Sequence, residues 1–256
     1  MGSALAEGLL RANWCSPESL CLIEPVAQLR EELSGRLSGV TVLASLELEH
    51  VGPETGAVLC VKPDVAEVAA RVAAACGVTR LLSVVAGLST ARIEAVFPSP
   101  TPVIRSMPNT PVLVGKGVSA IAGGAHVTKN DLEWAESILG AVGTVVRVTE
   151  KNIDAVTGLS GSGPAYLFLV VEAMIEAGVH QGLSRDVAKE LVVGTFEGAA
   201  AMLRTTGESP EELRAQVTSP GGTTAAGLRM LEGRAVRAAF LEAVAGATER
   251  SRQLGR

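Results

Sequence analysis

Residues 57–85 read AVLCVKPDVAEVAARVAAACGVTRLLSVV, which is two short apolar runs separated by a segment with helical patterning. The runs Ala57 to Val61 and Leu81 to Val85 are apolar at nearly every position. Strands that are apolar along their whole length are typical of parallel sheets with helices on both faces. This stretch therefore predicts two parallel strands connected by a helix.

The same alternation of apolar runs and helical patterns extends from Leu20 to about Val148, which predicts an α/β lobe. One helix start is specific: Thr128 lies three residues before Asp131 and predicts a cap for a helix over Asp131 to Leu139. The other predicted strands are Leu20 to Ile23, Val40 to Leu43, Val103 to Met107, Val118 to Ala122 and Thr144 to Val148.

After residue 150 the strand signals stop, and the patterns favour helices alone. Pro164 stands at a first-turn position, Ser184 is a predicted cap, and Ser209 to Glu212 form a predicted capping box with proline at the first helical position. We therefore expect an all-α lobe. The expected domains are residues 1–150 and 151–256.

The predicted helix from Tyr166 to Ala177 is apolar on almost every side, so both of its faces need cover. One interpretation is that helices of two subunits pack together here. The other is a central helix within one lobe.

Composition narrows the class of protein. Over 256 residues, 47% are hydrophobic and 19% charged, which excludes disorder and leaves room for two cores. We find no apolar run of the roughly 20 residues that a membrane span needs. The first ten residues contain Glu7 and no basic region, so we expect no secretory signal and a cytoplasmic protein.

Charge and cysteine content point to a small-molecule partner. A net charge of -5 and 3% aromatic residues argue against a nucleic-acid surface. The four cysteines show no C-x-x-C pair and are expected to be reduced core residues. The three histidines lie far apart, and we expect no metal site.

The start of the chain resembles the end of a phosphate-binding turn. In a dinucleotide fold, the last glycine of G-x-G-x-x-G opens a helix, and an acidic residue follows about 20 positions later. Gly2 and the helix after it, with Leu5 and Leu9 on one face, fit this pattern, and Glu24 then closes a strand. These residues alone are also compatible with an ordinary helix and a surface glutamate.

The strand that normally precedes this turn is central in its sheet. Its absence would leave neighbouring strands with unpaired backbone groups, each costing about 1 to 3 kcal/mol when buried. We therefore expect the natural protein to begin upstream of Met1.

Two glycine-rich segments are more specific. The first runs from Asp154 to Tyr166 and includes Ser160-Gly161-Ser162-Gly163-Pro164, which predicts a tight turn leading into a helix. The second is Val217 to Thr224, with Ser219-Pro220-Gly221-Gly222-Thr223-Thr224. Glycines that expose amides at a helix start can bind carboxylates or phosphates, although such clusters also serve as plain turns between helices.

Together with Val61-Lys62-Pro63, Val85-Ala86-Gly87 and Arg105 to Thr110, these two segments resemble the pyrroline-5-carboxylate reductase family along essentially the whole chain. The resemblance implies a Rossmann-like dinucleotide-binding lobe followed by an all-α dimerisation lobe. It also implies reduction of a cyclic imine to proline with NADPH or NADH.

The resemblance further implies the residues of the substrate site. The carboxylate would be held by backbone amides around Gly221, Gly222, Thr223 and Thr224, with the Thr224 hydroxyl at the ring nitrogen. Ser162 and Glu150 fall on substrate-side positions, and Thr224 and Glu150 are the candidate catalytic residues. Helix capping by Thr224 and a solvated acid at Glu150 are the alternatives.

The cofactor side is implied in the same way. The contacts are the turn ending at Gly2, with Glu24 at the ribose, and Val84, Val85 and Ala86 beside the nicotinamide. They also include Val61, Lys62 and Pro63, and Gln216, which stands where some relatives have Asn. Pro25 follows Glu24, and no basic residue is nearer than Arg30, so we favour a cofactor preference short of strict NADPH use.

Two other readings remain. A related hydroxyacid or imine dehydrogenase would need a catalytic lysine between the lobes, where only Lys151 is available. A chain that cannot hold the pyrophosphate would be an inactive dimerising partner. The family itself forms dimers with interlocked helical lobes, which often assemble further.

Overall fold

The computed structural model describes residues 1–255, and contacts divide the chain into two compact units. The first unit comprises Met1–Ser162 together with the residues from Ala245 onward, and the second comprises Gly163–Val244. All described strands belong to the first unit. The boundary predicted at residue 150 follows the end of the strand signals, whereas these two units are defined by contacts. The predicted domain boundary therefore stays a prediction.

Each strand predicted from the sequence is present, and its ends differ from the expected ones by two residues at most. The strand Val103–Met107 has the predicted bounds. The strands are β1 (Cys21–Ile23), β2 (Thr41–Leu43), β3 (Gly56–Leu59), β4 (Arg80–Ser83), β5 (Val103–Met107), β6 (Gly117–Gly123) and β7 (Gly143–Arg147).

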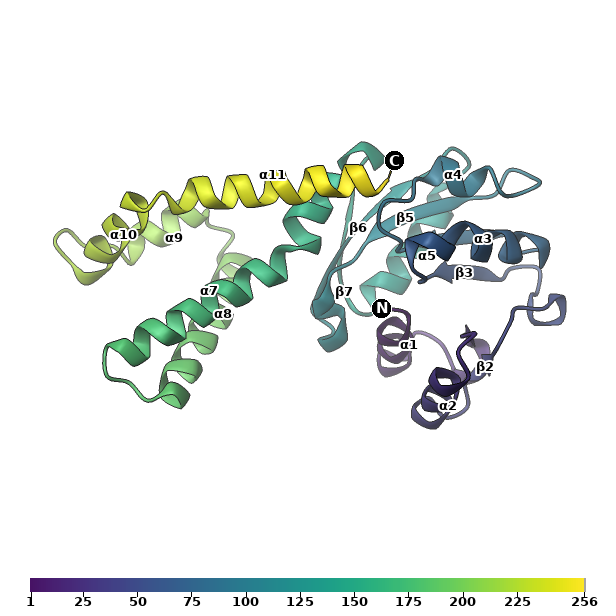
Figure 1. The fold of residues 1–256 in the computed structure, drawn as a ribbon, viewed down its shortest axis with the longest axis horizontal. Helices are drawn as coiled ribbons and strands as arrows, with labels where there is room; N and C mark the ends of the chain where they lie inside the picture. Colours follow the sequence, from purple (N-terminus) through teal and green to yellow (C-terminus); the bar gives the residue numbers. More distant parts are fainter. Residues whose placement is uncertain (256) are drawn as a thin grey trace. The chain divides into compact units, whose positions relative to one another are not determined.

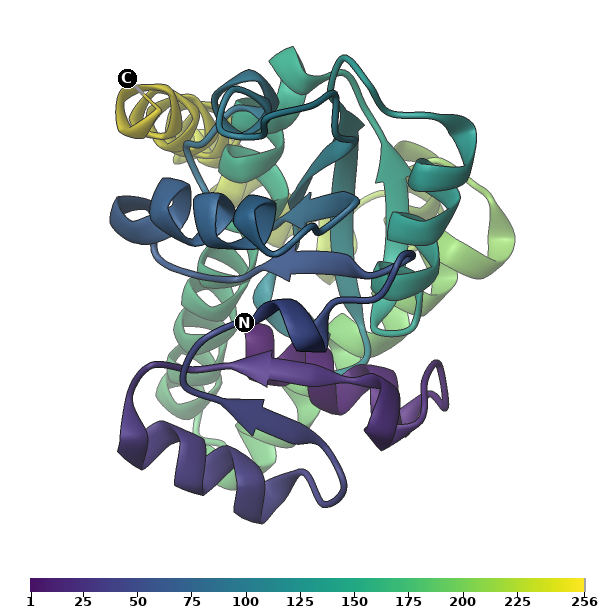
Figure 2. The ribbon, with the colours of Figure 1, turned by 90° about the vertical axis from the view of Figure 1, so that its right-hand side faces the viewer.

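The strands form two sheets (Figure 2). The larger has the order β3-β4-β5-β6-β7, in which β3, β4 and β5 are parallel, with Ala57 opposite Leu81. Strand β6 runs antiparallel to β5 and parallel to β7. The smaller sheet pairs β1 with β2 in parallel, with Leu22 opposite Val42. Within residues 1–255, β1 and β3 therefore each keep one edge without a ladder partner.

The larger sheet is covered on both faces, as the apolar runs predict. Successive residues of β4 enter different cores: Leu82 packs in a cluster with residues of α1 and α5, whereas Leu81 packs with residues of α3. Both side chains are fully buried. The first unit's helices labelled in Figure 1 are α1 (Gly2–Arg11), α2 (Ala27–Arg36), α3 (Ala66–Ala75), α4 (Thr90–Glu94) and α5 (Lys129–Gly140). The first unit also contains the short helix α6 (Ile153–Val156).

Helix α5 has the predicted cap at Thr128 and begins at Lys129, two residues before the expected Asp131. The Thr128 hydroxyl accepts a hydrogen bond from the Asp131 amide, and the Asp131 carboxylate accepts from both the amide and the hydroxyl of Thr128. This reciprocal capping box satisfies donors at the helix start. Ala135, Ile138 and Leu139 then lie on the buried face.

The second unit is helical throughout its described residues. The predicted caps are confirmed: Ser184 accepts from the Val187 amide, Ser209 forms a capping box with Glu212, and Pro164 lies in the first turn of α7. Its helices are α7 (Gly163–His180), α8 (Arg185–Thr206), α9 (Pro210–Gln216), α10 (Thr223–Gly233) and the first part of α11 (Val236–Leu254).

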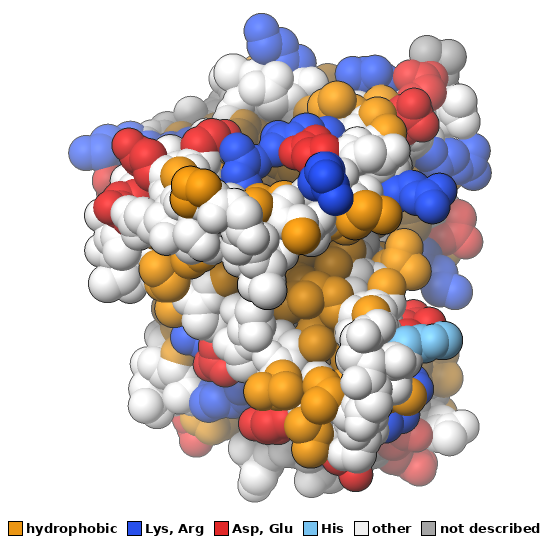
Figure 3. Space-filling model, turned by 90° about the vertical axis from the view of Figure 1, so that its left-hand side faces the viewer, with side chains coloured by type: hydrophobic (Ala, Val, Ile, Leu, Met, Phe, Trp, Pro, Cys, Tyr) orange, Lys and Arg blue, Asp and Glu red, His pale blue; other side chains and the backbone are white. Residues whose placement is uncertain are grey.

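Helix α7 is not covered within the chain. It packs against α8 along one side, where an added Cβ on Gly178 would meet the Ala188 Cβ at 3.0 Å. None of its residues is buried, and Phe168 and Leu169 are 66% and 67% exposed. Apolar side chains are gathered on one face of the molecule (Figure 3). A central helix enclosed by a single lobe is therefore wrong for the described chain.

One helical stretch, Glu150–His180, is long and apolar enough to span a bilayer, although it carries Glu172 and Glu176. This differs from the expectation that the chain contains no apolar run long enough for a membrane span. Length and composition do not separate a membrane span from a helix whose apolar face awaits a protein partner.

Candidate cofactor and substrate site

The segments predicted to bind the cofactor follow the carboxyl ends of parallel strands. Val61–Pro63 come after β3, and Val84–Ala86 come directly after β4, its parallel neighbour. The Val84 amide donates to the Leu59 carbonyl (3.1 Å), and the Val85 amide donates to the Ser83 hydroxyl (3.3 Å). Both segments therefore lie at the carboxyl-terminal edge of the sheet, beyond the ends of the strands, where open α/β sheets bind ligands.

Gly2 belongs to the same edge. It is the first residue of α1, and a Cβ added there would lie 3.1 Å from the Cβ of Cys60, next to Val61. A helix start with a glycine in close contact lets backbone amides approach a phosphate. The residues present thus fit a dinucleotide: Gly2 and the α1 amides suit the pyrophosphate, and Val84–Ala86 suit the nicotinamide side.

Cys60 lies next to Gly2 at this edge, and its side chain is uncharged. Burial raises the pKa of its thiol to about 11, so it stays protonated at neutral pH. All four cysteines are free, as expected. Cys21 is exposed, so its predicted place in the core is wrong; it lies in the small β1-β2 sheet, whose β1 strand has no buried residue.

Glu24 follows β1, as predicted, but its carboxylate already accepts a hydrogen bond from the Val26 amide (3.0 Å). The structure also brings Arg30 to this place. Its guanidinium Nη1 donates to the carbonyls of Glu24 (3.0 Å) and Pro25 (2.8 Å). The sequence distance of six residues is therefore closed by the first turn of α2, and a positive charge lies beside the residue predicted to contact the ribose.

Lys62 is exposed and directly precedes the 3-10 turn Pro63–Val65. No hydrogen bond or ion pair of its side chain is present in the described structure, so the amine extends into solvent beside Val61. It is free to contact a ligand.

The second glycine-rich segment forms the start of α10 in the second unit. Gly221 has a φ of +71°, and Gly222 is the N-cap residue, with its amide donating to the Ser219 carbonyl (3.1 Å). No side chain caps this helix among the described residues. Thr223 and Thr224 occupy its first turn, so the amides that would hold a carboxylate are available and Thr224 is not the cap.

The first glycine-rich segment differs from the prediction. It contains a π-helical turn, Thr157–Gly161, between α6 and α7, and the Ser162 amide donates to the Thr157 carbonyl (2.9 Å). The predicted tight turn is therefore wrong, whereas the predicted start of a helix at Pro164 is confirmed. A π-turn keeps the chain helical while adding one residue, and glycine tolerates the altered backbone.

Gln216 ends α9, and its side-chain amide donates to Glu208 (2.9 Å). Both residues belong to the second unit, whereas Gly2, Glu24, Val61–Pro63 and Val84–Ala86 belong to the first. The role of Gln216 at the cofactor stays a prediction.

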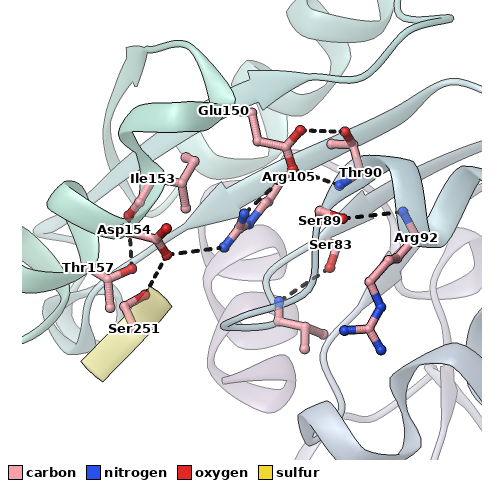
Figure 4. A network of polar contacts seen from close by, with 11 residues as sticks. Ser83, Ser89, Thr90, Arg92, Arg105, Glu150, Ile153, Asp154, Thr157 and Ser251 are labelled. Carbon is pink, nitrogen blue, oxygen red and sulfur yellow. Dashed lines mark hydrogen bonds and ion pairs between the residues drawn. The ribbon is translucent and has the colours of Figure 1, made fainter. Parts of the chain in front are cut away.

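Glu150 lies at the start of the 3-10 turn Glu150–Asn152, and both of its carboxylate oxygens have partners (Figure 4). One accepts from the Thr90 amide (2.7 Å) and the other from the Thr90 hydroxyl (2.6 Å). Arg105 from β5 places its Nη1 3.5 Å from the same carboxylate and its Nη2 3.9 Å from Asp154. The Asp154 carboxylate also accepts from Ser251 (2.7 Å).

Two residues of the segment Arg105 to Thr110, Arg105 and Asn109, have contacts that the sequence does not predict. Asn109 accepts from the Val118 amide (2.8 Å) and donates to the Ser160 carbonyl (3.3 Å), so it ties β6 to the π-turn. An arginine inside an otherwise buried strand was the available signal, because arginine is almost never buried without partners.

Comparison with known proteins places these features in a family. Residues 150–254 match the family model described as pyrroline-5-carboxylate reductase dimerisation. A pyrroline-5-carboxylate reductase of Corynebacterium melassecola is 43% identical over 262 residues, covering 100% of this chain and 96% of the relative.

Solved structures give the same result. A Plasmodium falciparum pyrroline carboxylate reductase with NADP bound superposes with a TM-score of 0.87 at 32% identity, covering 100% of this chain and 95% of the other. A pyrroline-5-carboxylate reductase from Coxiella burnetii gives 0.90 at 32% identity, covering 99% and 94%. The chain therefore belongs to the pyrroline-5-carboxylate reductase family.

Proposed function

We propose that this chain reduces 1-pyrroline-5-carboxylate to L-proline with NADPH or NADH, the last step of proline formation. The observation that carries the proposal is the 43% identity to a pyrroline-5-carboxylate reductase across the whole chain. When bound, the cofactor would supply a hydride to the carbon of the protonated imine, whose ring nitrogen keeps its proton and becomes the amine of proline. Chemistry of this kind needs positioning more than acid-base groups.

The first unit binds the cofactor in this proposal. The α1 amides that begin at Gly2 hold the pyrophosphate, Val61–Pro63 line the edge beside it, and Val84–Ala86 contact the nicotinamide. The positions of these segments after β3 and β4 support the assignment. Lys62 adds an exposed positive charge that suits a phosphate.

Arg30 bears on the choice of cofactor. The sequence alone favoured less than strict NADPH use, yet the Arg30 guanidinium lies against the backbone of Glu24. We therefore propose that both cofactors are used and that Arg30 favours NADPH by pairing with its 2′-phosphate.

The second unit binds the substrate carboxylate at the segment Gly221–Thr224, through the amides of Thr223 and Thr224, with Gly221 providing the left-handed turn and Gly222 the N-cap. The Thr224 hydroxyl contacts the ring nitrogen. Ser162 belongs to the substrate side through the hydroxyl that precedes α7. A carboxylate at an uncapped helix start gains from the amide donors and the helix dipole.

Assembly completes the proposal. The exposed apolar surface of α7 fits a homodimer in which helical units pack against each other, and a higher oligomer can be built from such dimers. We propose a cytoplasmic enzyme, with residues 1–150 as the dinucleotide-binding domain and 151–256 as the dimerisation and substrate domain.

The test is a spectrophotometric assay that follows oxidation of NADPH or NADH with pyrroline-5-carboxylate. Thr224→Ala should lower kcat/KM by roughly tenfold or more, since it removes a contact made at the reacting ring. Thr195→Ala is the control, because its hydroxyl only donates to the Leu191 carbonyl within α8. Absence of turnover with either cofactor, in protein that dimerises, would support the inactive-partner reading instead.

A further inference from the structure

A single buried guanidinium joins several parts of the first unit. The Arg105 side chain is 7% exposed and lies between the carboxylates of Glu150 and Asp154 (Figure 4). Its Nε is buried and has no hydrogen-bond partner in the described part of the chain. Burying a charged group costs free energy, because the charge loses its hydration. A protein in which apolar side chains replace such a buried charge network is often equally stable. Stability alone is therefore a poor reason for its presence.

The Glu150 side of the network ends at the segment proposed to contact the nicotinamide. That segment, Val84–Ser89, lies between β4 and α4. At its beginning Ser83 accepts a hydrogen bond from the Val85 amide, and at its end Thr90 is held by two hydrogen bonds to Glu150. Thr90 is 3% exposed, so water does not replace these bonds readily. The segment is thus fixed at both ends.

The Asp154 side of the network ends at the two places where the chain passes between the units. Asp154 lies shortly before the passage at Ser162, and Ser251 lies shortly after the return at Ala245. The Ser251 hydroxyl donates to Asp154 at 2.7 Å, and Ser251 is 3% exposed. Both connecting segments are therefore fastened to each other and to Arg105.

We infer that Glu150 and Arg105 are positioning residues that act through Thr90, which places the nicotinamide-side segment for hydride transfer. This inference rests on the proposed reductase function. It replaces direct contact between Glu150 and substrate with an indirect role, because both carboxylate oxygens already bind Thr90. A small displacement of the reacting groups is costly for turnover, whereas ground-state binding of the substrate depends on other residues.

The experiment compares Thr90→Val with Thr128→Val. Both threonines donate their amide and their hydroxyl to one carboxylate, but the Thr128 pair with Asp131 only caps α5. Thr90→Val should lower kcat by roughly tenfold, with KM for pyrroline-5-carboxylate changed by less than about twofold. Thr128→Val should leave both unchanged, and Thr90→Ser should restore kcat because it keeps the hydroxyl.

Glu150→Gln and the double variant Thr90→Val/Glu150→Gln test whether Glu150 affects kcat through Thr90. If Glu150 acts through Thr90, the double variant is no slower than the slower single variant. The inference is overturned if Thr90→Val keeps full kcat, or if Glu150→Gln multiplies the loss and raises KM for the substrate. If Thr90→Val folds poorly, Arg105→Lys is the second variant, because it keeps the positive charge but removes the guanidinium. An unchanged kcat in Arg105→Lys also overturns the role of Arg105.

The wild-type protein separates this inference from the proposed function. Turnover by wild type with unaffected Thr90 and Arg105 variants contradicts only the positioning role. A wild-type protein without reductase activity contradicts the proposed function itself.

Discussion

The two units of this chain are both rich in apolar residues but differ sharply in what they bury. The first unit contains two clusters of fully buried side chains, one on each face of its larger sheet. In the second unit, only Ala188 and Val192 are buried among the described residues, while Phe168, Leu169 and Leu241 are at least 66% exposed. The first unit carries its own core, and the second requires a partner surface.

The largest expected effect comes from a charge on α7. Leu169→Glu should convert the protein to monomers and reduce activity by roughly a hundredfold or more, because the apolar surface can no longer pack against a second copy. Light scattering after gel filtration measures the assembly. Leu48→Glu is the matched control, since Leu48 is 69% exposed in the first unit and Leu169 67% in the second. If both variants had the same assembly state and the same activity, the claim that the second unit needs a partner surface would be wrong.

The closed core of the first unit should protect Cys60. With a pKa of about 11, raised by burial, the thiolate fraction at pH 8 is about one in a thousand, against about one in ten for the ordinary value of 9.0. Iodoacetamide should therefore modify Cys60 about a hundredfold more slowly in the folded protein than in urea. Peptide mass spectrometry provides the rates, and rapid labelling of folded protein would contradict the burial.

A smaller effect is expected from alanine substitutions at two glycines of the second unit. Gly221 and Gly182 have φ values of +71° and +96°, and neither has neighbours that an added Cβ would strike. Alanine at either position should cost about 1 kcal/mol of stability. Only Gly221→Ala should also raise KM for pyrroline-5-carboxylate, by roughly tenfold, because it displaces the α10 amides. A similar KM in both variants would argue against substrate binding at this turn.

The smallest effect concerns the start of α9. The backbone amide and hydroxyl of Ser209 lower the pKa of Glu212 below its ordinary value of 4.5. Stabilisation by this capping box is present above pH 4.5 and is lost as the pH falls through the lowered value. Circular dichroism between pH 7 and pH 2 should show a small loss of helix that Ser209→Ala already displays at pH 7.

Local signals in the sequence predicted much of the fold. The caps at Thr128, Ser184 and Ser209 were correct because capping depends on residues within one helical turn. The strand Val103–Met107 has the predicted bounds, and its apolar residues Val103 and Ile104 are fully buried in the sheet. The antiparallel direction of β6 carried no comparable local signal.

Features that depend on distant residues were missed. Glu150 and Thr90 are 60 residues apart, and Asp154 and Ser251 are 97 apart, so spacing could not pair them. The sequence of Thr157–Gly161 predicts a tight turn instead of the observed π-turn, because glycine and serine are compatible with both. The candidate site residues follow from the family resemblance and not from local spacing in the sequence.

The most direct test is a crystal structure of the protein with NADP+ and L-proline. We predict two copies whose α7 surfaces are buried against each other. We also expect the proline carboxylate on the amides of Thr223 and Thr224 and the nicotinamide beside Val84–Ala86. Proline bound elsewhere, with the α10 start facing empty solvent, would contradict the account.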